Sequence, residues 1–308
     1  MKRVIAAFTL IFTLALFAVY SPLSAKAVEI STSETFTLNE IELYRAAQRK
    51  SEEDLSIQGY TSDAIAQLKS TNYEDLVYAR AQLPTETLIG MGYTVKEISI
   101  LRAYKGEYIE RGSEVYGLAG VLTAEIVCTS ASTNRYNVSY HWSWDHTPFV
   151  NAVDAMGIRW VAIASDGLPV DTSAFSSVAR VTYTYYPGDS IDRTYSASDS
   201  NFSSETNFNA LTCTFSMTYG SSSDPYYALS GSLTTTIQKD AAVSREIYYL
   251  KICGVYGHSI INIGAPSVSF TPGDTSIGIS FTGGLSIDNI GIKKYKIYTN
   301  GTKVAIDA

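Results

Sequence analysis

The stretch that decides the fold reads Val138-Ser-Tyr140-His-Trp142-Ser-Trp144. Large apolar side chains alternate with Ser and His, which places the two kinds on opposite faces of an extended strand. The same alternation recurs in the apolar sets Ile158, Trp160 and Ala162; Val181, Tyr183 and Tyr185; Leu211, Cys213 and Phe215; and Leu229, Leu233 and Ile237. One buried and one hydrated face is typical of an antiparallel sheet packed on a core. We therefore expect a β-sandwich.

The end of the chain carries a separate strand signal. Asn300-Gly301 lies between two short runs, 294–299 and 302–306, that read as strands. Asn-Gly favours the tight turn that joins paired antiparallel strands. The sequence therefore predicts a closing β-hairpin.

The density of charge changes along the chain. Residues 28–110 hold 14 acidic and 8 basic residues, whereas 111–308 hold 16 and 12 in more than twice the length. The first zone is rich in Ala, Leu, Glu, Gln and Arg with apolar residues at helical spacing. We predict an α+β protein: a small N-terminal helical repeat module at 28–110 and an antiparallel β-sandwich domain at 111–308.

The helical zone contains an internal repeat. Leu55-x3-Gly59-Tyr60-Thr61-x3-Ile65-x2-Leu68 matches Leu88-x3-Gly92-Tyr93-Thr94-x3-Ile98-x2-Leu101 at an offset of 33 residues. Each Gly can end a helix in the left-handed conformation, the following Tyr can close a Schellman cap, and the Thr can cap the next helix. Each unit is predicted to be two short helices joined by a Gly-Tyr-Thr turn.

The first residues are typical of an export signal. Lys2 and Arg3 precede an apolar run over 4–20, and Ala25-Lys26-Ala27 fits the pattern of a cleavage site. We predict a signal peptide at 1–27, and a secreted or extracellular mature chain that is at most loosely associated with the cell surface. The apolar run has the shortest length that could span a membrane, and Pro22 after it favours a signal peptide over an anchor. The mature chain is expected to have no transmembrane segment.

Net charge excludes one class of partner. The whole chain has 23 basic and 30 acidic residues, and the signal peptide removes three of the basic ones. Nucleic-acid binders carry a basic surface, so we expect no nucleic acid as a partner. Attachment to an anionic polymer would need local chemistry.

The cysteines and histidines point to no catalytic site. Cys128 and Cys213 lie on apolar strand faces, so a disulfide between them and a pair of buried thiols are both open, with Cys253 left over. His141 and His146, with nearby carboxylates, have no third ligand at metal-site spacing. We predict no cofactor, no metal site and no catalytic residue. An enzyme would require a cleft that gathers a His with two carboxylates.

One segment carries a family resemblance. The pattern Tyr140-His-Trp-Ser-Trp144-x3-Pro148-x5-Asp154-x2-Gly157-Ile158-x-Trp160, together with Tyr256-Gly257-His258, resembles a group of uncharacterised exported proteins of spore-forming, Gram-positive-type bacteria. The resemblance implies the same layout of a helical repeat followed by a β-sandwich. It implies no activity, catalytic residue or ligand.

Aromatic residues supply the candidate contacts. Trp142 and Trp144, with Tyr185 and Tyr186, could form a ligand face such as a sugar-stacking platform, although strand alternation favours a core position for the tryptophans. Tyr60 and Tyr93 are the candidate partner contacts of the helical module. The partner itself is unknown, a surface glycan or another exported protein being the candidates.

These observations predict an exported, non-enzymatic binding or structural protein. Two alternatives remain open. The segment 190–239 holds 20 Ser and Thr. The amphipathic strands of β-pore-forming, aerolysin-like secreted proteins are also rich in Ser and Thr. The aromatic residues would also suit a secreted carbohydrate-active protein.

Overall fold

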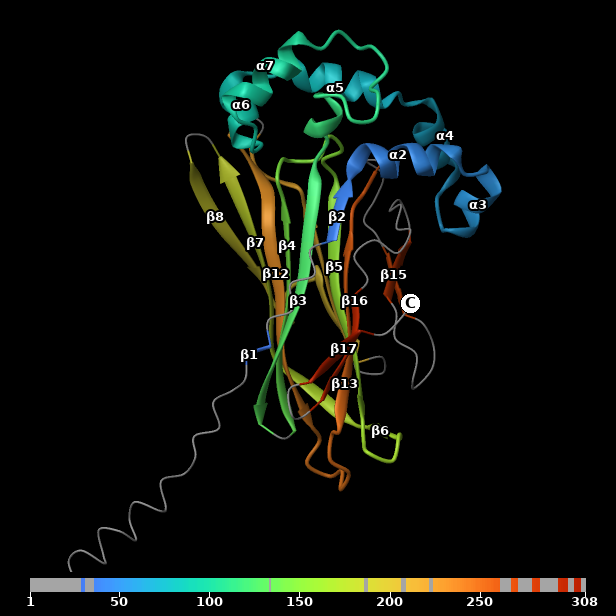
Figure 1. Ribbon diagram of the computed structural model, residues 1–308, viewed down its shortest axis with the longest axis vertical. Helices are drawn as coiled ribbons and strands as arrows, with labels where there is room; N and C mark the ends of the chain where they lie inside the picture. The colour runs from blue at the N-terminus through green and yellow to red at the C-terminus, as the bar shows by residue number, and fades with distance from the viewer. Residues whose placement is uncertain are drawn as a thin grey trace, which may run out of the picture.

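The computed structural model describes residues 29–30, 36–132, 134–185, 188–205, 209–221, 224–260, 267–270, 279–282, 293–298 and 302–305. The predicted signal peptide, Tyr186 and the Asn300-Gly301 turn lie outside these residues. The described chain is α+β: helices near the N-terminus lie across one end of a β-rich part (Figure 1).

The helical part lies between residues 40 and 118. It consists of α2 (Glu40–Arg49), α3 (Glu52–Ile57), α4 (Ser62–Ser70), α5 (Tyr73–Ala81), α6 (Thr85–Gly90), α7 (Val95–Ala103) and the 3-10 helix η1 (Tyr116–Leu118). Most α-helices here begin with a polar side chain that accepts a backbone N–H of the first turn, which satisfies an otherwise unpaired donor. Among the described residues, no helix combines the length and the apolar character that a bilayer span requires.

The two Gly-Tyr-Thr turns have the same backbone geometry. Gly59 and Gly92 have φ of 88° and 97°. The N–H of Tyr60 donates to the Leu55 carbonyl, and that of Tyr93 donates to the Leu88 carbonyl, which is the long hydrogen bond of a Schellman cap. Thr61 caps α4, and Thr94 caps α7 in a capping box with Glu97. The predicted turn chemistry is confirmed.

Within the described residues, the larger sheet has eight strands, all antiparallel to their neighbours. In order across the sheet they are β1 (Glu29–Ile30), β3 (Val121–Ser132), β4 (Arg135–Trp144), β12 (Pro225–Lys239), β7 (Thr172–Tyr185) and β8 (Asp189–Tyr195), with β2 (Phe36–Asn39) on β3 and β11 (Thr218–Gly220) on β12.

The second sheet has seven strands in the part of the chain that the structure describes, and it is also antiparallel. In order they are β17 (Lys303–Ala305), β16 (Lys293–Tyr298), β13 (Tyr249–Gly257), β5 (Val153–Ile163), β10 (Ala210–Ser216) and β9 (Phe202–Glu205), with β6 (Pro169–Val170) on β5; β14 (Ser267–Phe270) and β15 (Ile279–Thr282) form a separate pair. Because β16 pairs with β17, the predicted pairing of the C-terminal strands is confirmed.

One apolar core contains residues of both sheets. Trp142 of β4 stacks on Phe215 of β10, with ring centroids 5.1 Å apart. Tyr140 of β4 approaches β13 so closely that a Cβ at Gly254 would lie 2.4 Å from its ring. Alternate residues of β4 are buried, in the pattern expected from the sequence. The core therefore excludes water from the apolar face of each sheet.

Two sequence predictions change at the N-terminus. The predicted helical module of 28–110 is not helical throughout, because β1 and β2 pair with β3 of the larger sheet. The helical core is also not separate, since it includes Phe149, Val150 and Tyr227 from the β-rich part. The helices therefore fold against the sheets.

The structure decides between the two states that the sequence leaves open for the cysteines, a Cys128–Cys213 disulfide and buried thiols. Cys128, Cys213 and Cys253 are buried thiols, so the Cys128–Cys213 disulfide is not formed. Burial raises the pKa of the Cys213 thiol to about 12, which keeps this thiol protonated and unreactive.

The turn at Gly92 yields a stability prediction. A Cβ at Gly92 would lie 2.8 Å from the Asp145 carbonyl oxygen, whereas a Cβ at Gly106, which also has positive φ, meets nothing within 4 Å. Gly106→Ala is expected to cost about 1–2 kcal/mol from the left-handed conformation alone. Gly92→Ala should cost at least about 1 kcal/mol more because backbone must move. Urea denaturation of both variants checks this; equal costs would contradict the close contact.

Candidate functional site

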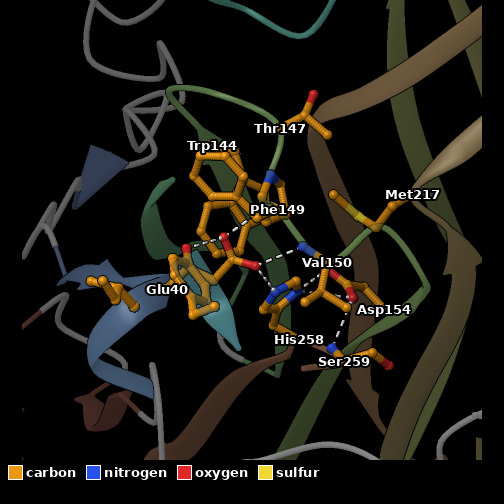
Figure 2. Close-up of polar contacts among 12 residues, drawn as sticks. Glu40, Trp144, Thr147, Phe149, Val150, Asp154, Met217, His258 and Ser259 are labelled. Atoms are coloured by element: carbon orange, nitrogen blue, oxygen red, sulfur yellow. Dashed lines mark hydrogen bonds and ion pairs between the residues drawn. The ribbon is translucent and has the colours of Figure 1, made fainter. Parts of the chain in front are cut away.

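A buried carboxylate connects the helices to the sheets. Glu40, the first residue of α2, is fully buried. One of its oxygens accepts the N–H of Phe149 at 2.6 Å and the hydroxyl of Tyr73 at 3.0 Å, and the other accepts the N–H of Val150 at 2.8 Å. Because every one of these donors is itself buried, the carboxylate replaces water for all of them (Figure 2).

His258 lies between this carboxylate and a second one. Its Nε2 is 3.4 Å from Glu40 and its Nδ1 is 3.0 Å from Asp154, a residue of β5. The three side chains are at most 2% exposed. Residues 40, 154 and 258, which lie far apart in the sequence, thus meet in one cluster, which we call the histidine–carboxylate network (Figure 2).

Further donors satisfy Asp154. The Tyr256 hydroxyl donates to it at 2.6 Å and the Ser259 N–H at 3.0 Å. The indole Nε1 of Trp144 in turn donates to the Tyr256 oxygen at 3.0 Å, and the Trp144 ring packs edge-on against His258. A fully satisfied buried polar network is rigid and specifies one arrangement of its elements.

The charges of the network follow from these contacts. Burial opposes the charged form of His258, but the attraction and hydrogen bonds of Asp154 and Glu40 outweigh it and raise the pKa of His258 to about 10. Burial also opposes the charged form of Glu40, yet its bonds to His258, Val150 and Phe149 lower the pKa of that carboxyl. At neutral pH the network therefore holds an imidazolium between carboxylates.

The histidine–carboxylate network is better suited to a structural role than to proton transfer. Both imidazole nitrogens face carboxylates, and a general base needs a pKa near the working pH and access to its substrate. The network has neither a free imidazole nitrogen nor an exposed side chain among these three residues. Its contacts hold four parts of the chain together: helix α2, the segment that follows β4, strand β5, and the end of β13.

A second histidine makes a similar contact nearby. His146 is 3.2 Å from Glu97 of α7 and 3.1 Å from Asp145, and its ring stacks on Tyr93 at 4.6 Å. Burial opposes protonation, but Asp145 and Glu97 prevail and raise the pKa of His146. Buried Arg80 completes the contact by donating to the carbonyls of Thr147 and Pro148.

The structure corrects the predicted tryptophan ligand face. Trp142 and Trp144 are 2% and 3% exposed, and Trp160 is 2% exposed. Their rings lie in the core that both sheets share, so no indole face is open to a sugar. Strand alternation had favoured this core position.

The predicted partner contacts at Tyr60 and Tyr93 are also wrong. Both side chains are buried in the helical core, at 4% and 2% exposure. Tyr93 does make a contact between two parts of the molecule, but its ring packs on His146 of the same chain.

Tyr185 lies in a more open aromatic group. Its ring is 5.2 Å from that of Tyr226, and the rings of Tyr183 and Tyr219 are 5.6 Å apart. Tyr185 and Tyr226 are half-buried and Tyr219 is 38% exposed. We call Tyr183, Tyr185, Tyr219 and Tyr226 the tyrosine patch. The other predicted residue, Tyr186, lies outside the described residues.

Polar groups border the tyrosine patch. The Tyr226 hydroxyl donates to Asp189 at 3.0 Å, and the Tyr185 hydroxyl is 3.5 Å from Asp224. The guanidinium of Arg193 lies 4.7 Å from the centre of the Tyr219 ring and donates to its hydroxyl at 3.0 Å. These charged side chains are exposed, so the patch combines ring surfaces with groups that can exchange hydrogen bonds with a ligand.

Sequence reasoning missed Glu40 and His258 as partners. Glu40 follows Asn39, the residue that caps α2, so it reads as an ordinary acidic residue of a first helical turn. His258 directly follows an apolar strand and has no charged neighbour in sequence. Two signals could have drawn attention to it: a buried strand that ends in a histidine, and the resemblance pattern that contains both Asp154 and His258.

Comparisons with known proteins give little further information. No protein-family model matches the sequence, and no curated protein matches it. Among solved structures, the chain is similar to AvmM, which catalyses macrocyclization in alchivemycin A biosynthesis, with 12% identity over 61% of this chain and 90% of that chain and a TM-score of 0.23. A likeness this slight carries no argument about fold or activity.

The network predicts a large cost for losing one charge. Glu40→Gln should lower the free energy of unfolding by about 3–5 kcal/mol, because it leaves His258 without one of its two buried carboxylates. Glu52 occupies the same first position of α3 but is exposed, so Glu52→Gln should cost less than about 1 kcal/mol. Urea denaturation measures both. Similar costs for the two variants would contradict the structural role of the network.

The same network predicts a pH dependence. The stabilisation that a raised histidine pKa supplies is complete below about pH 6.5 and is lost as the pH rises through the folded-state pKa, about 10 for His258. The free energy of unfolding should therefore fall from pH 7 to 10, by at most about 1.4 kcal/mol per pH unit for this group.

His258→Gln supplies the control for this pH dependence. The variant should be less stable at pH 7 and should have a shallower slope over pH 7.5–9 than the unaltered protein. Equal slopes in the two proteins would show that His258 does not carry the raised pKa. The lowered pKa of Glu40 acts on the acid side, where its stabilisation is lost as the pH falls below about 4.5.

Proposed function

We propose that this chain is an exported, non-enzymatic binding protein whose ligand contact is the tyrosine patch. One observation carries the proposal: Tyr219, Tyr185 and Tyr226 are partly exposed rings that are bordered by charged groups and packed over the buried Tyr183. Clustered exposed aromatic surface is typical of interaction sites. The finer architecture that we propose is a β-sandwich of the two sheets, with the helices packed at one end.

The distribution of chemical groups supports binding over catalysis. The residues best suited to acid–base chemistry, His258 with Glu40 and Asp154, are enclosed in the network and paired with one another. The patch itself has partly exposed side chains instead: three tyrosines, two aspartates and an arginine. The histidine–carboxylate network makes the fold rigid. A rigid fold suits a binding surface, because less conformational entropy is lost when the ligand binds.

The pore-forming alternative has no comparable support. The Ser/Thr-rich segment 190–239 contributes strands to both sheets, among them β8 and β12 of the larger one and β10 of the smaller one. A hydrated sheet face accounts for its composition without a second conformation. Pore formation remains a prediction from the sequence alone.

Cell walls are a suitable first probe of an exported binding protein. The protein collected from the medium of an expressing bacterium should begin at Val28. It should sediment with walls isolated from a spore-forming Gram-positive bacterium. The double variant Tyr219→Ser/Tyr226→Ser should stay in the supernatant, with at least about a tenfold weaker affinity, because it loses two ring surfaces.

Tyr108 offers a matched control, since it is 68% exposed and lies outside the patch. Tyr108→Ser should sediment like the unaltered protein, and all variants should show the same thermal transition within a few degrees. Equal sedimentation of the patch variant and the control would refute the patch as the contact. Failure of the protein to reach the medium would refute export.

A further inference from the structure

The tyrosine patch is an ordered row across four strands. Asp189 of β8 is the cross-strand partner of Tyr185 of β7, and Tyr226 of β12 is the partner of Tyr219 of β11. The Tyr227–Thr184 pairing brings Tyr226 beside Tyr185 and joins the two halves of the row. Side chains of directly paired residues lie on one face of the sheet. A ligand on this face would meet the carboxylate and the three rings in turn.

The exposure of the tyrosine side chains increases from the buried face of the sheet toward the end of the row. Tyr183 is 1% exposed and belongs to the shared core, where its hydroxyl donates to the Ser216 carbonyl at the end of β10. Exposure then increases to the half-buried Tyr185 and Tyr226 and to Tyr219. β8, the edge strand of the larger sheet, lies on the far side of β7 from β12 (Figure 1). The rings therefore pack on the core at Tyr183 and are open to solvent at Tyr219.

The hydroxyl groups of these tyrosines are already oriented. The hydrogen bond to Asp189 raises the pKa of Tyr226, so its hydroxyl stays protonated and donates to the carboxylate. The Tyr219 hydroxyl accepts from Arg193. A carboxylate has about four acceptor positions, so Asp189 can also accept hydrogen bonds from ligand hydroxyls, and the guanidinium of Arg193 can donate to a ligand oxygen. Ring faces in fixed positions suit the C–H faces of a ligand.

The charges at the patch select against an anionic ligand. Asp189 and Asp224 outnumber Arg193, which is already bound to the Tyr219 hydroxyl. The chain as a whole has a net charge of −7. An anionic polymer would be repelled from this surface, whereas a neutral ligand with many hydroxyls would satisfy both carboxylates and the ring faces.

We infer that the tyrosine patch binds a neutral oligosaccharide of at least two sugar units. Two ring pairs follow each other along β7, Tyr219 on the buried Tyr183 and Tyr185 with Tyr226. The exposed Tyr219 ring offers one stacking position, and the half-buried pair offers the other. The aspartates accept hydrogen bonds from the sugar hydroxyls at the border of the row. This assignment rests on the proposed function, since it names the ligand of the same surface.

Calorimetric titration with defined probes tests the ligand class. The probes are the neutral tetrasaccharides of cellulose, of mannan and of N-acetylglucosamine, the matching monosaccharides, and an anionic hyaluronan tetrasaccharide. At least one neutral tetrasaccharide should bind, about tenfold or more tightly than its monosaccharide, because the second ring pair is then occupied. The hyaluronan fragment should bind more weakly or not at all.

Variants test where the sugar binds. Tyr219→Ser should weaken binding about tenfold, while Tyr219→Phe, which keeps the ring, should retain most of the affinity. Asp189→Asn should weaken binding several-fold and Tyr108→Ser should leave it unchanged. A matching thermal transition for each variant shows that it is folded. Neutral binding that Tyr219→Ser leaves intact would overturn the assignment.

The remaining outcomes separate this inference from the proposed function. If walls retain the protein through the patch but no neutral tetrasaccharide binds, the ligand class is wrong and the binding function stands. Binding of only the anionic fragment also overturns the ligand class. If neither walls nor any tetrasaccharide bind, both the inference and the proposed function fail.

Discussion

The structure depends on how one buried carboxylate is satisfied. Glu40 has to be hydrogen-bonded because an unpaired charge in the core would cost several kcal/mol. Its partners come from α5, from the segment after β4 and from the end of β13. The carboxylate therefore links α2 to α5 and to two segments of the β-rich part. These contacts fasten the start of α2 to the sheets (Figure 2).

That constraint explains the division of roles among the aromatic and charged residues. The indoles of Trp142 and Trp144 pack on the Tyr256 ring, the imidazole of His258 packs on Trp144, and all four side chains are buried. The tyrosine patch lies elsewhere, toward the β8 edge of the larger sheet. A core held by buried hydrogen bonds such as those of Tyr256 and Tyr183 can present such a patch as a rigid surface, and rigidity lowers the entropic cost of binding.

Local patterns in the sequence predicted the parts of the fold that short-range physics controls. Alternation from Val138 to Trp144 predicted a strand with buried aromatic residues, and Gly59 and Gly92 predicted helix ends with positive φ. Glu40 and His258 are separated by 218 residues, so no local pattern connects them. The same limit applies to the short strand Phe36–Asn39, whose pairing with β3 depends on the sheet already present. Tyr185 was predicted as a ligand residue, but its ring partner Tyr226 and the further patch residue Tyr219 come from other strands.

The charge state of His258 is the most direct test of this account. Nitrogen-15 NMR of the imidazole distinguishes an imidazolium, in which both nitrogens carry protons, from either neutral tautomer. Because Asp154 and Glu40 face the two nitrogens, both should be protonated at pH 8, where an ordinary histidine is neutral. A neutral His258 at pH 8 would contradict the ion network that fastens the helices to the sheets.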